Sequence, residues 1–244
     1  MPTIKNIYVL YEQGMDVLAP HLKDALGEMM DCFPEFKANY PIKILGNWSN
    51  GRGHHESVEW YIKTAQLRSQ QEGRFQRTGQ ISIEQLADDF ISDPYTKTIP
   101  QWQILVTKKD LYARGLNYCL GYSQENAFSI VSTARFIKGN EFDLEGFKTV
   151  LMHEFGHCIG LAKEGRAHTE ENLGSHCTNT GCIMQQRADG DFRDLTRFRL
   201  EAKRLYGLPP ICGDCIKDGK KFFTRQQIIY NHTHGLDTFY GISR

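Results

Sequence analysis

Apolar residues in the first half of the chain alternate between runs that suit strands and spacings that suit helices. The runs are short and are bounded by prolines, glycines or polar clusters, which is typical of strands in a sheet. Three of them predict strands: Ile4–Tyr11, Ile42–Trp48 and Gln101–Thr107. Apolar residues at helical spacing predict helices after Asp16, around Val58 and Tyr61, and around Leu86 and Phe90. Elements of both kinds, mixed along the chain, predict an α/β fold.

The most distinctive stretch is VLMHEFGHCIG, from Val150 to Gly160, which lies within a longer helical pattern. Its apolar side chains cluster on one side by the 3.6-residue period, and His153 and His157 fall on the opposite side. Asp143 can cap the start of this helix, and Gly160 can end it. We therefore expect two imidazoles on one helix face, turned toward a cleft.

This helix carries the residue types of a zinc enzyme. Two histidines four residues apart can hold one zinc ion, and Glu154, directly after the first, suits a general base acting on water better than a third ligand. Metzincin-type zinc proteases have a further histidine ten residues after the first, and here that position is Lys163. An ammonium group has no lone pair for a metal, so a third ligand must come from elsewhere.

A second motif, HCTNTGCIM, runs from His176 to Met184, and a CxxC pair follows later. Together with the helix it resembles the archaemetzincin family, whose signature reads HExxHxxGxxHCx4CxM and then CxxC. The chain supplies the later elements of that signature in order, with thirteen extra residues, Lys163–Ser175, before the histidine and a longer gap before the CxxC pair. The residues that match these later elements are His176, Cys177, Cys182, Met184, Cys212 and Cys215.

The resemblance covers roughly Ile104 to Cys215 and implies a metzincin-like fold, with a mixed twisted sheet, backing helices and an active-site helix. It implies an upper lobe over residues 1–160 and a smaller zinc-stabilised lower lobe over residues 161–244, which would hold the third ligand, a Met-turn and a C-terminal helix. Leu116–Ser123 resembles the edge strand above the cleft, where an extended peptide could pair; a strand inside the sheet is the alternative. Phe128–Phe136 would be its neighbour, and Arg135 matches a position of the family.

The resemblance implies a zinc-dependent metallopeptidase in which Glu154 is the general base. For the third ligand we favour His176 over His168, because His176 adjoins Cys177 in the family's order whereas His168 lies within the polar insert. The sequence also allows an alternative from a different class of protein. It is a non-catalytic zinc-stabilised binding module with a decayed protease site, against which the retained Glu154 argues.

Cysteines supply a second group of candidate ligands. Cys177 with Cys182 and Cys212 with Cys215 form two close pairs, which suit a closed tetrahedral structural zinc. The cofactors expected are thus one catalytic and one structural zinc ion. A redox role for the CxxC pair is the alternative. The other three cysteines, Cys119 among them, lie among apolar residues and are interpreted as core thiols.

Composition adds limits on partners. The 244 residues carry 29 basic and 29 acidic side chains, so nothing favours nucleic acid or an acidic membrane surface as a partner. The N-terminal residues show no apolar run of signal-peptide length, and no later run is long enough to span a bilayer. We therefore expect a cytoplasmic protein that acts on peptides or proteins, monomeric by default.

Overall fold

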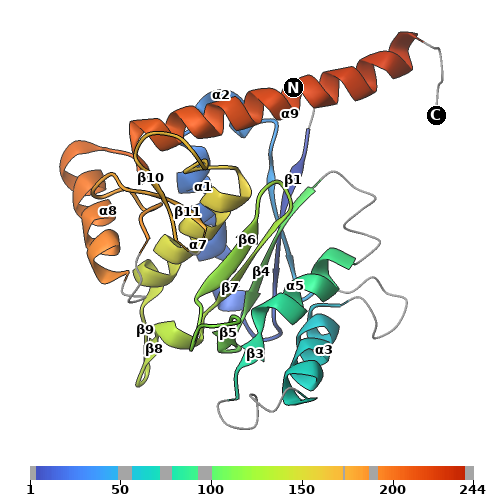
Figure 1. Ribbon diagram of the computed structural model, residues 1–244, viewed down its shortest axis with the longest axis vertical. Helices are drawn as coiled ribbons and strands as arrows, with labels where there is room; N and C mark the ends of the chain where they lie inside the picture. Colours follow the sequence, from blue (N-terminus) through green and yellow to red (C-terminus); the bar gives the residue numbers. More distant parts are fainter. Residues whose placement is uncertain are drawn as a thin grey trace.

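The computed structural model describes residues 4–48, 57–71, 79–92, 101–172, 174–186 and 192–239. Its centre is a five-stranded sheet with the strand order β2-β1-β4-β7-β6, in which β6 alone runs antiparallel to its neighbour (Figure 1). In chain order these strands are β1 (Asn6–Tyr11), β2 (Ile42–Gly46), β4 (Gln101–Thr107), β6 (Gly121–Gln124) and β7 (Phe128–Ser132). The predicted α/β class and its mixed sheet are confirmed.

Burial explains which strands lie inside the sheet. Every residue of β4 and of β7 is buried, as expected for strands covered on both faces. In β6 half-buried and exposed residues alternate, and this strand lies at the edge of the sheet, as the resemblance implies for Leu116–Ser123. It begins only at Gly121, because the N–H of Cys119 is bonded to the carbonyl of Leu111 at 2.9 Å instead.

Helices cover both faces of the sheet (Figure 1). The helices that pack into one core include η1 (Asp16–Leu18), α1 (Ala19–Met30), α2 (Pro34–Lys37) and α7 (Leu144–Cys158), and the other core contains α3 (Val58–Gln71) and α5 (Ile83–Ser92). Side chains alternate across the pleat, so Ile104 packs into the first core and Leu105 into the second. Among the described residues, no helix is long and apolar enough to cross a membrane.

Short paired strands and two further helices complete the fold. The pairs are β3 (Ile81–Ser82) with β5 (Leu111–Tyr112), β8 (Ile137–Lys138) with β9 (Glu141–Phe142), and β10 (Thr169–Glu171) with β11 (Ser175–Cys177). A 3-10 turn, η2 (Ala134–Phe136), follows β7, and the helices α8 (Arg193–Tyr206) and α9 (Gly213–Phe239) follow β11.

The long helix α9 crosses one end of the sheet and is anchored near its start (Figure 1). Phe223 is fully buried there, and its ring lies 5.2 Å from that of Phe33, 4.9 Å from that of Tyr40 and 6.0 Å from that of Trp102. These contacts attach the last part of the chain to the core that contains α7. The first turns of α9 are thereby held close to the motif-bearing helix.

The helix α7 begins and ends where the sequence predicts. The side chain of Asp143 accepts a hydrogen bond from the N–H of Gly146 at 2.9 Å, which satisfies one of the free donors of the first turn. After the last turn Gly160 adopts φ +68°, a left-handed conformation that favours glycine. A Cβ at this position would also lie 3.0 Å from the ring of Phe222 of α9.

A buried arginine fastens α8 to α1 and α7. The side chain of Arg199 is 1% exposed and pairs with Glu28 of α1 at 3.3 Å and with Glu145 of α7. On the same helix, Arg197 pairs with Asp194 at 3.1 Å, but both side chains are about 60% exposed. The two arginines differ mainly in burial, so their ion pairs should differ in their contribution to stability.

We predict that Arg199→Met lowers the free energy of unfolding by about 2 kcal/mol, because Glu28 and Glu145 lose their shared buried donor and keep only their lysine partners. Arg197→Met, the matched control, should cost less than about 1 kcal/mol, since exposed pairs contribute little. Urea denaturation followed by circular dichroism measures both. Equal losses for the two variants would contradict this account of how α8 is held.

Candidate active site

Three imidazoles meet between α7 and β11. His153 and His157 come from α7 and His176 from β11, and one ring nitrogen of each lies within 4.8 Å of the others. The ring centroids of His153 and His157 are 4.7 Å apart, and that of His176 lies 5.3 Å from the first and 4.8 Å from the second. The structure thus brings together the three histidines predicted from the motifs.

Hydrogen bonds set which nitrogens carry protons. Nδ1 of His153 lies 2.6 Å from the carbonyl oxygen of Ile183, and Nδ1 of His176 lies 3.0 Å from that of Gly174, so each Nδ1 must donate. The Nε2 atoms of both rings then carry lone pairs. Nε2 of His157 lies 3.1 Å from Nε2 of His153. Such a convergence of nitrogen lone pairs is the donor set of a catalytic zinc site, so the residues fit that ion.

Burial keeps these rings neutral. It lowers the pKa of His153 to about 4, helped by the neighbouring His176, and it also lowers the pKa values of His157 and His176. A metal ligand must be the neutral imidazole. At neutral pH no proton therefore has to be removed before a cation can bind.

The insert positions the third histidine, His176, which follows it directly in the chain. Its described residues include a hairpin arm, β10, whose Glu170 pairs with His176 and whose Thr169 pairs with Cys177. The insert is polar in sequence, and antiparallel pairing of β10 with β11 orders part of it. His168 is exposed, lies at the turn before β10 with φ +61°, and is not part of the cluster.

Met184 packs beneath the motif helix. Its side chain is fully buried and fills the space beside Gly156, where a Cβ would collide with its sulfur. Its carbonyl accepts the N–H of Cys177 at 2.8 Å. Met184 is thus a packing residue, and it holds β11 against α7.

Glu154 lies beside the three histidines but belongs to a different network. Its Oε2 accepts a hydrogen bond from Ser123 Oγ at 2.7 Å, and its carbonyl accepts one from Ser129 Oγ at 3.1 Å. Burial raises the pKa of Glu154 to about 7, against the lowering effect of the Ser123 hydroxyl. A carboxylate with a pKa near 7 can both take and return a proton at neutral pH.

The two serines were not predicted as site residues. Ser123 and Ser129 lie directly opposite each other on β6 and β7, and their hydroxyl oxygens are 3.1 Å apart. Their only signal in the sequence is that both are hydroxyl residues within two segments that we expected to be neighbouring strands. Which face they share depends on the pairing register of the strands, which the sequence does not give.

A cavity of about 530 Å³ opens next to this cluster. His153, Glu154 and His176 lie on one wall of it. The residues from Ala113 to Tyr122 line it as well, together with Ile83 and Glu84 at the start of α5. Cys119, which we expected in the core, is half-buried and contributes to this lining, because its segment turns away from the sheet toward Leu111.

Arg135 braces the outer wall of the cavity. Its guanidinium donates two hydrogen bonds of 2.8 Å to Asp110 and stacks on the ring of Tyr118 at 3.9 Å. Gln80 adds a second brace, since its amide nitrogen donates to Asp110 and to the carbonyl of Asn117, each at 3.0 Å. The sequence alone did not show the role of Arg135. These contacts indicate that it holds Tyr118 in the cavity wall.

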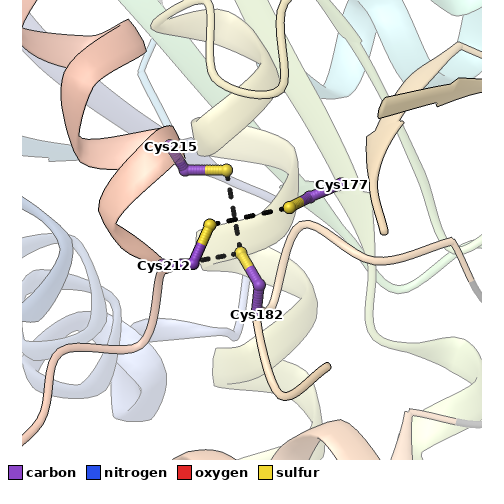
Figure 2. Close-up of side chains that lie close together, drawn as sticks. All are labelled: Cys177, Cys182, Cys212 and Cys215. Carbon is purple, nitrogen blue, oxygen red and sulfur yellow. Dashed lines mark hydrogen bonds between the residues drawn. The ribbon is translucent and has the colours of Figure 1, made fainter. Parts of the chain in front are cut away.

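The four motif cysteines form a second cluster (Figure 2). Their sulfurs all lie within 4.8 Å of one another, with 3.6 Å between Cys177 and Cys212 and 3.7 Å between Cys182 and Cys215. All seven cysteines of the chain are free thiols. Figure 2 shows the four side chains pointing toward a common centre from β11, from the turn after it and from the start of α9.

Nitrogen donors surround these sulfurs. The N–H of Asn179 donates to Cys177 at 3.4 Å and its amide nitrogen to Cys212 at 3.2 Å, while the N–H of Cys212 donates to Cys182 at 3.4 Å. Donors of this kind stabilise thiolates. Four close sulfurs in such surroundings fit a tetrahedral metal site without an open position.

The chain was compared with known protein families, sequences and solved structures. No family model matches the chain. It is 27% identical to an archaemetzincin from Thermococcus kodakarensis over 118 residues, which is 45% of this chain and 50% of that protein. It is 33% identical to an archaemetzincin from Methanopyrus kandleri over 81 residues, 32% of this chain and 39% of that protein. The chain thus spans half or less of the length of these curated relatives.

Solved structures extend the likeness in fold. The crystal structure of the archaemetzincin from Methanopyrus kandleri matches 91% of this chain and 95% of its own, with a TM-score of 0.52 and 17% sequence identity. Fold and site therefore define a metzincin-like α/β protein with a histidine cluster and a cysteine cluster. With the sequence matches, the resemblance predicted from the motifs is confirmed: the chain is similar to archaemetzincins in sequence and in fold.

Gly121 provides a test of how closely Glu154 is confined. A Cβ at this position would lie 2.6 Å from Cγ of Glu154 and 2.8 Å from the carbonyl oxygen of Ile130, so the carboxylate or the β6–β7 pairing must move. We predict that Gly121→Ala lowers the melting temperature and disturbs the carboxylate. Gly27→Ala, in the open middle of α1, should instead stabilise by up to about 1 kcal/mol.

Differential scanning calorimetry compares the two variants. The carboxylate itself can be followed by NMR titration of Glu154 with labelled glutamate. An unchanged melting temperature together with an unchanged Glu154 signal in Gly121→Ala would show that the contact is looser than the structure indicates.

Proposed function

We propose that this protein is a zinc-dependent metallopeptidase that hydrolyses peptide bonds, with one catalytic and one structural zinc ion. One observation carries the proposal. Three imidazole nitrogens converge on one point, and a buried carboxylate that is not one of them lies beside the same cavity. A purely structural metal site has no use for that carboxylate. The archaemetzincin relatives support the same assignment.

The chemistry divides between the ion and the chain. A zinc ion held by His153, His157 and His176 would supply a Lewis acid that activates water and polarises a carbonyl. Glu154 takes the proton of the attacking water and returns it to the leaving amine. The Ser123 hydroxyl donates a hydrogen bond to one carboxylate oxygen of Glu154 and holds this group in place.

The substrate is a peptide or protein bound in extended form. The strand β6 pairs with β7 on one side and lies at the edge of the sheet, and Gly121 and Tyr122 of β6 also line the cavity. A peptide can add to such an edge through backbone hydrogen bonds, which do not depend on its sequence. Side-chain preference would then come from the wall that Arg135 braces.

The four cysteines hold the structural zinc in this proposal. The site has no open position, and it ties β11 and its following turn to the start of α9. We place the boundary of the upper lobe at residue 160, where α7 ends in a left-handed glycine, with the lower lobe over residues 161–244. Seven free cysteines suit a reducing compartment such as the cytoplasm.

We predict that Glu154→Gln keeps its zinc but loses about 100-fold or more of its peptide hydrolysis, because it removes the base and leaves the imidazoles. Zinc is counted by elemental mass spectrometry, and hydrolysis is measured on a peptide library with free and blocked termini. Glu171→Gln, exposed on β10, is the matched control and should match the wild type. If Glu154→Gln cleaves as fast as the wild type, the mechanism is wrong.

The third ligand has its own test. His176→Ala should sharply weaken zinc binding at the histidine site, because it removes one of three nitrogens from a pre-formed cluster. His168→Ala, an exposed histidine of the insert, should leave zinc affinity and hydrolysis unchanged. Competition with a chromogenic chelator measures both affinities. The reverse result would mean that the insert supplies the ligand.

A further inference from the structure

Arg166 connects the insert to the cysteine cluster. Its Nε donates to Oδ2 of Asp218 at 2.6 Å, and its Nη2 donates to the sulfur of Cys215 at 3.1 Å. Its Nη1 donates to two carbonyls of the insert, at 2.8 Å to that of Ala167 and at 3.3 Å to that of His168. The arginine side chain is 16% exposed and that of Asp218 7%, so the contact is largely shielded from water.

Asp218 is the fixed point of this arrangement. It lies on α9 three residues after Cys215, on the same face of the helix. The same Oδ2 also accepts the backbone N–H of Lys163 at 3.3 Å, so one carboxylate holds both the start of the insert and its arginine. The insert is thereby attached to the helix that contains Cys215 and that begins directly after Cys212.

The guanidinium has an electrostatic consequence for the cysteines. Four thiolates around a divalent cation carry a net charge of about −2. A positive group that also donates a hydrogen bond to one sulfur offsets part of this charge in a poorly hydrated place. Groups that contact ligands in this way tune how strongly a metal is held.

The same side chain also fixes the backbone that leads to the histidine cluster. The carbonyl of His168, which Arg166 binds, accepts the N–H of Thr178 at 3.0 Å as well. The strand β10 then pairs with β11, which carries His176 for one cluster and Cys177 for the other. A shift of the insert would therefore move ligands of both clusters.

We propose that Arg166 is a positioning residue for both metal clusters, and that the insert serves to bring it there. Held by Asp218, it neutralises and orients Cys215 and keeps β10 in register with the strand that bears His176 and Cys177. The inference rests on the proposed function only in that the two clusters hold zinc. It assigns a role to the thirteen residues that separate this chain from the archaemetzincin spacing.

The test measures metal retention in the whole protein. Zinc release into excess chelator is followed with a colorimetric zinc indicator, and cobalt-substituted protein identifies the site through its thiolate charge-transfer band. Arg166→Met should weaken metal binding at the cysteine cluster by about 10- to 100-fold, with a smaller loss at the histidine cluster. Arg166→Lys keeps the positive charge but cannot make all the hydrogen bonds of the guanidinium, so its loss of metal binding should be intermediate.

Controls separate this role from general damage. Glu164→Gln, exposed in the same insert, should release metal at the wild-type rate. Should Arg166→Met fail to fold, Asp218→Asn and Arg166→Lys decide the question, because both keep side-chain volume and should still release metal faster. Wild-type release rates in all folded variants of Arg166 and Asp218 would overturn the proposal. A wild type that holds zinc but cleaves no peptide would refute the proposed function alone.

Discussion

One short strand joins the two clusters, and the rest of the candidate site depends on it. His176 and Cys177 are adjacent in β11, and successive side chains of a strand point to opposite sides, so one reaches the histidine cluster and the other the cysteine cluster. Pairing with β10 and the bond to the Met184 carbonyl hold this strand in place. Anything that fixes Cys177 therefore also fixes the third imidazole.

Desolvation gives the site its chemical character. α7 is buried along most of its length, and the same burial keeps the imidazoles neutral and raises the pKa of Glu154 to about 7. The sheet then supplies what the helix cannot. Ser123 holds the carboxylate, and Gly121 leaves room for it beside the edge strand. The motif on α7 therefore forms a candidate site only together with residues of the strands β6 and β7.

Local patterns predicted the elements well, because strand runs, helical spacing and the Asp143 cap depend on neighbours in sequence. The convergence of the histidines and of the cysteines was also predictable, because the order of these residues along the chain resembles that of the archaemetzincin signature. Contacts across long sequence separations were not. The Ser123–Glu154 bond, the place of Cys119 in the cavity wall and the contacts of Arg166 with α9 all require strand register or the course of the insert. No periodicity encodes these.

The central claim is that adjacent residues of β11 serve two different zinc sites, and X-ray absorption at the zinc edge tests it most directly. With zinc counted in the same sample, the account predicts two ions per chain, one for each of the two clusters. The spectrum should contain sulfur and imidazole neighbours together, and Cys177→Ser should remove mainly the sulfur signal. A single zinc ion with only sulfur, or only nitrogen and oxygen, around it would contradict the claim.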